Sequence, residues 1–318
     1  MIGVANPTSS LEAWWTPTWT PSPPHCRSPS TICCSKHPTW RHGGHRWGSR
    51  PSSSDAELVT LAVRQALLGF TSEARWLRYA GRHLRHLFPY LPGQSGYNKR
   101  LRRTTELLGH LIRVVACDTR LWSDDVWVVD STPVERGRSR ETAKRSALAG
   151  WAQHGSCASH SRSFWGLRLH LVGTLHGRPV AAALVGAKAD ERQVLVDLLA
   201  VEPQLVAARP GQVLIADKHY YGGEFERLLG ERGLRLLRPA RKGEAERAGA
   251  DLFRPLRQLI ESVNQTFKGQ LDRERHGGHT GVGVAVRVLQ RILALTAVIW
   301  HNDKTGQPTL RSLVAYDH

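Results

Sequence analysis

The sequence predicts an α/β fold in which a mixed sheet is flanked by helices and preceded by a small helical region and an N-terminal leader. Three observations carry this prediction. From residue 122 onward, short apolar runs alternate with helical patterns. Two of these runs, Val126–Val129 and Val213–Ala216, are each followed by an aspartate. Between residues 55 and 121 the apolar residues recur at helical spacing.

Residues 1–54 are predicted to be a disordered leader. They hold eight of the 17 Pro and five of the 11 Trp but a single acid, Glu12, and no helical or strand period runs through them. Several cysteines and histidines gather here, but their spacing fits no paired C-x-x-C pattern, so a zinc site is not favoured. A second interpretation is that the segment lies upstream of the true start or is read in another frame.

Residues 55–121 are predicted to form three short helices. Ser54 or Asp55 can cap the first, over Glu57–Leu68, because a short polar side chain there can accept from the free amides of the first turn. Ser72 begins the second helix in the same way.

The third helix, from about Asn98 to Cys117, has one apolar and one basic face. The basic face consists of Lys99, Arg100, Arg102 and Arg103. Arg100 and Arg103 are therefore candidate DNA contacts, and the alternative is a solvated face on a packing subdomain.

Residues 122–303 are predicted to form the main α/β domain, followed by a tail over 304–318. The expected strands are Val126–Asp130, Phe164–Leu175, Pro179–Gly186, Val213–Ala216 and Arg235–Arg238. The expected helices are Glu191–Leu199, capped by Asp190, then Glu224–Leu229, 252–272 and 282–300. The segment from Arg136 to Ser163, rich in Arg, Ser, Gly and His, is expected to be an exposed loop beside the first aspartate.

The bulk composition points to a polyanionic partner. The formal net charge is +17 with a pI near 10.4, which is typical of proteins that bind nucleic acid or an anionic membrane. The five cysteines are odd in number and irregular in spacing, which favours a reducing cytoplasm. Charged and polar residues interrupt the apolar stretch Val282–Trp300, so it is predicted to be a core helix and no membrane association is expected. No signal peptide is expected either.

Three acidic residues form the candidate site. Asp130 and Asp217 follow apolar strands, and Glu261 lies in a helical stretch with Arg257 four residues before it and Lys268 seven after. Carboxylates at strand ends and on a facing helix can converge, and oxygen ligands beside a polyanion suit Mg²⁺. The arginine and lysine share the helix face of Glu261 and can hold phosphates. This is a chemistry for cutting or joining DNA phosphodiesters.

The same residues carry a family resemblance. The pieces are DSTPVER (Asp130–Arg136), ADKHYYG (Ala216–Gly222) and RQLIESVNQTFK (Arg257–Lys268), together with LFPYLPGQSGYNKRLRR (Leu87–Arg103) upstream. Residues 55–303 resemble an insertion-sequence transposase of the DDE class, whose third motif is R-x3-E-x6-K. The resemblance implies an RNase H-like fold, with Mg²⁺ or Mn²⁺ bound by Asp130, Asp217 and Glu261.

Two positions depart from the family pattern. The family often has Tyr three residues before the signature arginine, where this chain has Arg254. The second motif usually has Gly where this chain has His219. Arg254 and Lys218 are further candidate phosphate contacts.

The sequence therefore predicts a cytoplasmic, nucleoid-associated bacterial-type transposase. Its DNA partners are expected to be the terminal inverted repeats of its own element and the target DNA, and the resemblance implies a homodimer on DNA. Two alternatives stay open. One is a metal-dependent nuclease with the same three acids but no joining step. The other is a DNA-binding protein whose catalytic centre is lost.

Overall fold

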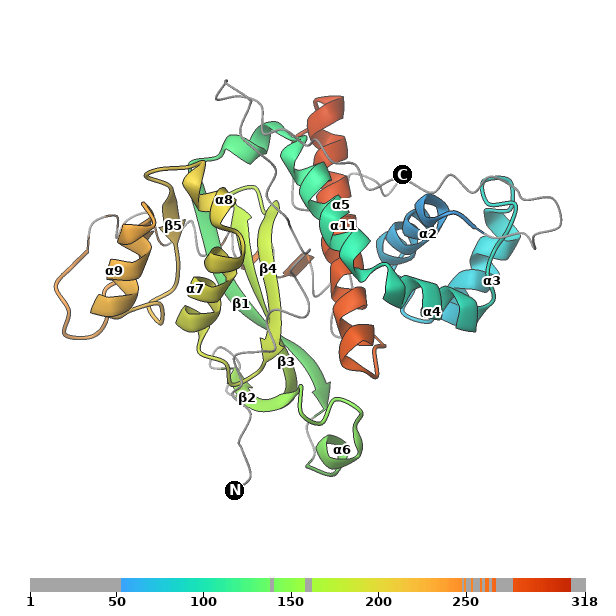
Figure 1. The fold of residues 1–318 in the computed structure, drawn as a ribbon, viewed down its shortest axis with the longest axis horizontal. Coiled ribbons are helices and arrows are strands. Elements are labelled where there is room, and N and C mark those ends of the chain that lie inside the picture. The colour runs from blue at the N-terminus through green and yellow to red at the C-terminus, as the bar shows by residue number, and fades with distance from the viewer. Residues whose placement is uncertain are drawn as a thin grey trace, which may run out of the picture.

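The computed structural model describes residues 53–137, 140–157, 162–247 and 277–309, with isolated positions between 249 and 266. Helices α2 (Asp55–Leu67), α3 (Glu73–His83) and α4 (Gln94–Arg103) of the helical region lie at one end of the molecule, and α9 (Gly223–Glu231) lies at the other end (Figure 1). A six-stranded sheet lies between them, with the long helix α11 (Gly281–Thr305) on the side of the helical region. The expected leader lies outside the described residues except for Ser53 and Ser54.

The helical region contains four helices rather than three. They are α2 (Asp55–Leu67), α3 (Glu73–His83), α4 (Gln94–Arg103) and α5 (Thr105–Cys117). Ser54 caps α2 as predicted, in a reciprocal capping box with Glu57. The expected third helix is interrupted at Thr104, whose hydroxyl donates to the carbonyl of Leu101. Because such a side-chain bond competes with the backbone ladder, the chain breaks there into two helices.

The sheet is mixed. Its order is β2-β3-β1-β5-β6, with β4 pairing the second half of β3. The strands are β1 (Val126–Gly137), β2 (Gln153–Cys157), β3 (Arg162–Thr174), β4 (Pro179–Gly186), β5 (Val213–Ile215) and β6 (Arg235–Leu237). β1 pairs antiparallel with β3 and parallel with β5, and β5 pairs parallel with β6. Antiparallel strands on one side of β1 and parallel strands on the other confirm the RNase H-like fold.

Two expectations about this part of the chain were wrong. β1 does not end at Asp130 but continues to Gly137, because β3 offers a partner along its whole length. The segment from Arg136 to Ser163 is not simply a loop, since it contains helix α6 (Arg140–Arg145) and strand β2. β2 forms because it can add to the free edge of β3, a signal that is not local in the sequence.

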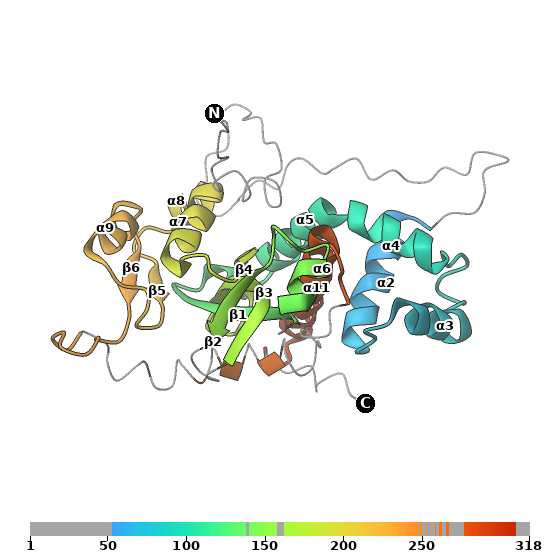
Figure 2. The ribbon, with the colours of Figure 1, turned by 90° about the horizontal axis from the view of Figure 1, so that it is seen from below.

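The two faces of the sheet pack on different helices (Figure 2). One face is covered by α7 (Glu191–Val201), α8 (Pro203–Ala207) and α9 (Gly223–Glu231), which share a core with Trp127 and Val129 of β1. The other face packs on α11 and the helical region through Leu169 and Leu171 of β3. Asp190 caps α7 as predicted, accepting from the amides of Arg192 and Gln193.

Helix α11 is a core helix, as predicted. It is long and apolar enough to cross a membrane, and it is the one such helix in the described part of the chain. Of its most apolar window, 78% is buried inside the molecule. Arg287, Gln290 and Arg291 are buried along it and bond to the helical region or to the helix itself. The helix therefore joins the sheet to α2–α5.

Candidate active site

Two candidate carboxylates meet at the same level of the sheet. In the parallel ladder Val126 pairs with Val213 and Val128 with Ile215. Continuing this register by two residues places Asp130 opposite Asp217. Neighbouring strands lie about 4.8 Å apart, so a continued register would let the two carboxylates share a cation. Asp130 is half-buried and Asp217 is exposed, as suits a site open to substrate.

The turn after β5 holds Asp217 in place. The backbone N–H of His219 donates to Oδ1 of Asp217 at 2.7 Å. A main-chain amide makes this bond, so it does not require the glycine that is usual at this position of the family. Lys218, between the two, is exposed and stays a candidate phosphate contact.

Tyr220 lies in this turn, and its pKa responds to the charged groups around it. Its side chain is buried, which is the main cause of a pKa well above that of free tyrosine. The carboxylates of Glu191, Asp130 and Asp217 raise the pKa further, while Arg168 lowers it. A third carboxylate, Glu191, therefore lies near the two aspartates. The sequence alone assigned Glu191 only to the first turn of a helix.

The sheet alternation decides on which face Asp130 lies. Trp127 and Val129 face α7, α8 and α9, so Ser131 shares that face and Asp130 points to the opposite one. In Figure 2 the described pieces of the segment 253–266 lie on the side of the sheet away from α7 and α8. These described pieces are thus on the face to which Asp130 points.

The third motif itself is described only in part. Glu261 is helical and exposed. Arg254, Arg257 and Lys268 lie outside the described residues. Within the described ranges no group of three or more His, Cys, Asp and Glu side chains is arranged to hold a metal ion. Asp130 and Asp217 supply the oxygen donors that a divalent cation prefers, and the role of Glu261 as third ligand stays a prediction.

Arginines and a tyrosine border the acidic pair. The guanidinium of Arg241 stacks on the Tyr221 ring, 3.6 Å from its centroid, and that of Arg192 lies 5.2 Å from the same centroid. Arg192 also donates to the carbonyl of Tyr221 and to the carboxylate of Asp190, whose pKa is lowered to about 2 mainly by that bond. These cations lie beside the second motif, where an anionic backbone would approach.

The helical region carries a second basic surface, and it differs from the expected one. Arg100 is partly used inside the fold, since it donates to Ser53 at 2.6 Å and to Asp55 at 3.1 Å. Arg103 is exposed. A further row, Arg75, Arg78 and Arg82, is exposed along one side of α3. In the sequence, the helical spacing of these three arginines is the one pattern that points to such a row.

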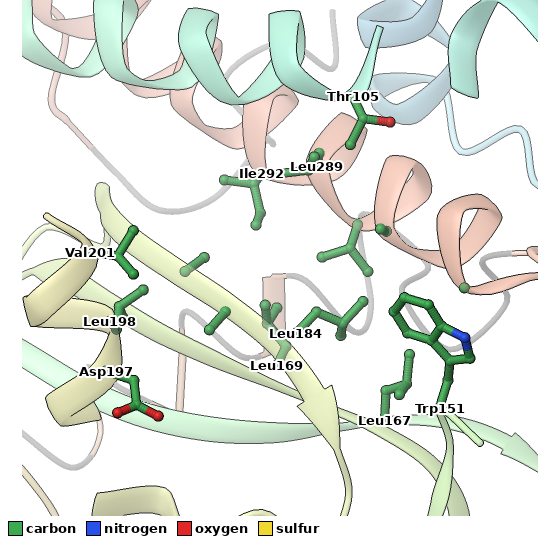
Figure 3. A pocket seen from close by; sticks show the side chains of 15 residues that line it. Thr105, Trp151, Leu167, Leu169, Leu184, Asp197, Leu198, Val201, Leu289 and Ile292 are labelled. Atoms are coloured by element: carbon green, nitrogen blue, oxygen red, sulfur yellow. The ribbon is translucent and has the colours of Figure 1, made fainter. Parts of the chain in front are cut away.

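The apolar pocket in Figure 3 is separate from the acidic pair. It lies between α11 and strands β3 and β4, and its walls include Leu167, Leu169, Leu289 and Ile292. None of the three candidate acids lines it. Its walls are apolar packing surfaces with one carboxylate, Asp197, so it offers no chemistry for a phosphodiester.

The strand order of the sheet and the helices on its two faces define an RNase H-like fold. Over residues 121–297, more than half of its 318 residues, the chain matches the family described as "Transposase DDE domain". The chain belongs to this family, and it is a transposase whose partner is DNA. No protein among the curated sequences matches the chain.

Proposed function

We propose that this chain cuts the ends of its own insertion element and joins them to target DNA, with Asp130, Asp217 and Glu261 holding Mg²⁺ (Mn²⁺ as a substitute). The observation that supports the proposal is the parallel β1–β5 pairing, which ends two residues before Asp130 on one strand and two residues before Asp217 on the other, in a chain of the transposase family. Divalent ions bound there would activate a nucleophile and stabilise the leaving oxygen.

The protein's own groups do the positioning. The His219 amide fixes the Asp217 carboxylate, and the sheet fixes Asp130. Lys218, Arg254, Arg257 and Lys268 are proposed to hold the phosphates on either side of the reacting one, because cations flanking the acids offset the repulsion between carboxylates and DNA. The reaction would run in two steps at one site: cleavage at the element end, then attack of the freed 3′-hydroxyl on target DNA.

We further propose that the helical region binds the terminal inverted repeat. Arg75, Arg78 and Arg82 of α3, with Arg100 and Arg103 of α4, are among its exposed or half-exposed cations. Two ends must be brought together for joining, so a homodimer on DNA in the nucleoid is part of the proposal.

Replacing Glu261 by Gln tests the catalytic assignment. Gln keeps the size of the side chain but removes the charge that holds the cation. Cleavage of a duplex carrying the terminal repeat should fall by at least the roughly hundredfold that disturbing a metal ligand's support can cost. Binding in a gel shift should stay within twofold, since it rests on Lys and Arg. Cleavage by Glu261→Gln at the wild-type rate would remove Glu261 from the site.

The products separate the alternatives. Strand-joining products with a supplied target duplex identify a transposase, whereas cleavage without joining identifies a nuclease. Binding without either identifies a remnant that has lost catalysis. Asp130→Asn and Asp217→Asn serve as matched negative controls for both steps.

A further inference from the structure

A group of polar side chains lies directly behind Asp130, on the other face of the sheet. Ser131, the next residue on β1, donates from Oγ to Oε1 of Glu191 at 2.6 Å. Nη1 of Arg168 on β3 donates to the same Oε1 at 2.5 Å and to Ser131 Oγ at 3.0 Å. Nη2 of Arg168 donates to the carbonyl of Ser156 on β2 at 2.8 Å. One guanidinium therefore connects β1, β2, β3 and α7.

Burying this group costs free energy, because its charges are removed from water. Only 15% of the Arg168 side chain and 23% of the Glu191 side chain are exposed. Removing two charges from water can offset the attraction between them, so such a pair is weak evidence for a stabilising role. Nε of Arg168 and both ring nitrogens of the neighbouring His170 are buried and have no hydrogen-bond partner among the described residues. A purely structural packing layer would be better filled by apolar side chains.

The position of the group shows what it can do. The parallel ladder between β1 and β5 ends at Val128 and Ile215, two residues before the aspartates. Beyond that point the strand that pairs with β1 among the described residues is β3, with Asp130 opposite Leu171 and Ser131 opposite His170. The bonds from Arg168 and Glu191 to Ser131 supply a second restraint where the ladder has stopped. They fix the side chain of Ser131, the residue next to Asp130 on β1.

We propose that Arg168 and Glu191 are positioning residues that hold Asp130 level with Asp217 for binding of the divalent cation. The inference rests on the proposed function. Glu191 is not itself assigned as a ligand, because its Oε1 is already shared by Ser131 and Arg168. Ser131 and Asp130 lie on opposite faces of β1, so the bonds to Ser131 on one face leave Asp130 open to a cation on the other.

The test measures metal binding apart from catalysis. Mn²⁺ affinity of the DNA-free protein is read from the signal of free Mn²⁺ in electron paramagnetic resonance, and Mg²⁺ half-saturation from cleavage. Groups that orient a metal ligand typically change metal affinity about 10- to 100-fold. Arg168→Ala and Glu191→Gln should each weaken Mn²⁺ binding at least about tenfold. Arg168→Lys should restore part of the loss, since it keeps the charge without the fork of donors.

Two controls keep the test decisive. Arg209→Ala removes another half-buried arginine, which donates to the carbonyl of Trp122 before β1 begins, and it should leave Mn²⁺ affinity within twofold. DNA affinity in metal-free buffer should be unchanged in all variants. Where Arg168→Ala does not fold by circular dichroism, Ser131→Ala, which removes a single hydroxyl, takes its place.

The outcomes separate this inference from the proposed function. The positioning role alone would be overturned by two results together. The wild-type protein would bind Mn²⁺ and cut DNA, and the folded Arg168 and Glu191 variants would bind Mn²⁺ with an affinity within twofold of the wild type. A wild-type protein that neither binds Mn²⁺ nor cuts the end duplex would overturn the proposed function. Weaker Mn²⁺ binding in the Arg168 and Glu191 variants, with Arg209→Ala unaffected, supports both.

Discussion

Two buried arginine–glutamate pairs occupy different parts of this molecule. Arg168 and Glu191 lie behind the catalytic edge of the sheet, whereas Arg287 of α11 contacts Glu73 of α3 at the junction with the helical region. The second pair is more deeply buried, with 7% and 11% of its side chains exposed against 15% and 23% for the first. The same two residue types thus connect strands beside a site in one place and helices within the core in the other.

Arg287 and Glu73, the junction pair, form hydrogen bonds with side chains of other helices, whereas Arg168 and Glu191, the site pair, both bond to Ser131 of β1. Arg287 donates to Gln65 at 3.2 Å and to Gln290 at 2.8 Å, and Glu73 also accepts from Asn98 at 2.6 Å. Although Glu73 is in contact, burial together with the charge of Arg291 lowers the pKa of Arg287 to about 10. Arg287 therefore stays charged at neutral pH. The comparison teaches that the junction pair holds helices together, while the site pair constrains one strand.

Breaking one partner of each pair should give the largest difference. Arg287→Ala leaves the Glu73 carboxylate buried without its arginine, and removing one partner of a buried pair typically costs about 3–5 kcal/mol. Arg168→Ala should cost less, roughly 1–2 kcal/mol, because water reaches its pair more easily. Free energies of unfolding from urea titrations check this. Equal losses at the two sites would show that burial does not distinguish the pairs.

The site pair has a neighbour that should make stability depend on pH. Burial lowers the pKa of His170 to about 4, the charge of Glu191 partly opposes this by raising the pKa, and the charge of Arg168 has a smaller lowering effect. The His170 imidazole takes up a proton near pH 6.5 in the unfolded chain but only near pH 4 in the folded protein. Stability contributed by neutral His170 is therefore complete above pH 6.5 and is lost as the pH falls toward 4.

The His170→Gln variant isolates this dependence. Each pH unit within that window is worth up to about 1.4 kcal/mol for one group. The wild-type free energy of unfolding should therefore fall by roughly 3 kcal/mol more than that of His170→Gln between pH 6.5 and pH 4. Parallel curves for the two proteins would show that His170 is protonated in the folded state.

Replacing each pair by apolar residues sharpens the comparison in the opposite direction. Well-packed apolar substitutes for a buried ion pair are often neutral or stabilising by about 1–4 kcal/mol. The double variant Arg287→Leu, Glu73→Leu should retain at least wild-type stability and wild-type Mn²⁺ affinity. The double variant Arg168→Leu, Glu191→Leu should also stay folded but lose Mn²⁺ affinity about tenfold or more. Unchanged Mn²⁺ binding in the second variant would make the two pairs equivalent.

Sequence patterns were sufficient where the signals are local. Pro179–Gly186 is a strand with the predicted bounds, and Ser54 caps α2 as its spacing from Glu57 suggests. Asp130 and Asp217 were singled out because each follows an apolar run, and those runs are neighbouring parallel strands whose pairing ends two residues before each aspartate. The predicted fold class was confirmed because it depends on the order of apolar runs and helical patterns along the chain, which is also a local signal.

The parts that were missed depend on partners far away in the sequence. The second half of β1 contains Pro133 and polar residues and looks like a turn. It is a strand because β3 pairs with it, and a proline is tolerated where no further strand pairs on the β5 side. Glu191 looked like a helix-dipole residue beside the cap. Its partner Ser131 is 60 residues away, so no local pattern could reveal the bond.

The smallest expected effects come from removing one hydroxyl from each group. Tyr97→Phe removes the donor to Gln65 at 2.9 Å in the junction group, and Ser131→Ala removes the donor to Glu191 at 2.6 Å in the site group. A single hydrogen bond contributes about 0.5–1.5 kcal/mol, so both variants should lose about 1 kcal/mol of unfolding free energy. Because the bonds of the Ser131 hydroxyl restrain the residue next to Asp130, only its loss should also weaken Mn²⁺ binding. Equal Mn²⁺ affinities of the two variants, beside equal losses of stability, would show that the site group acts on packing and not on the position of Asp130.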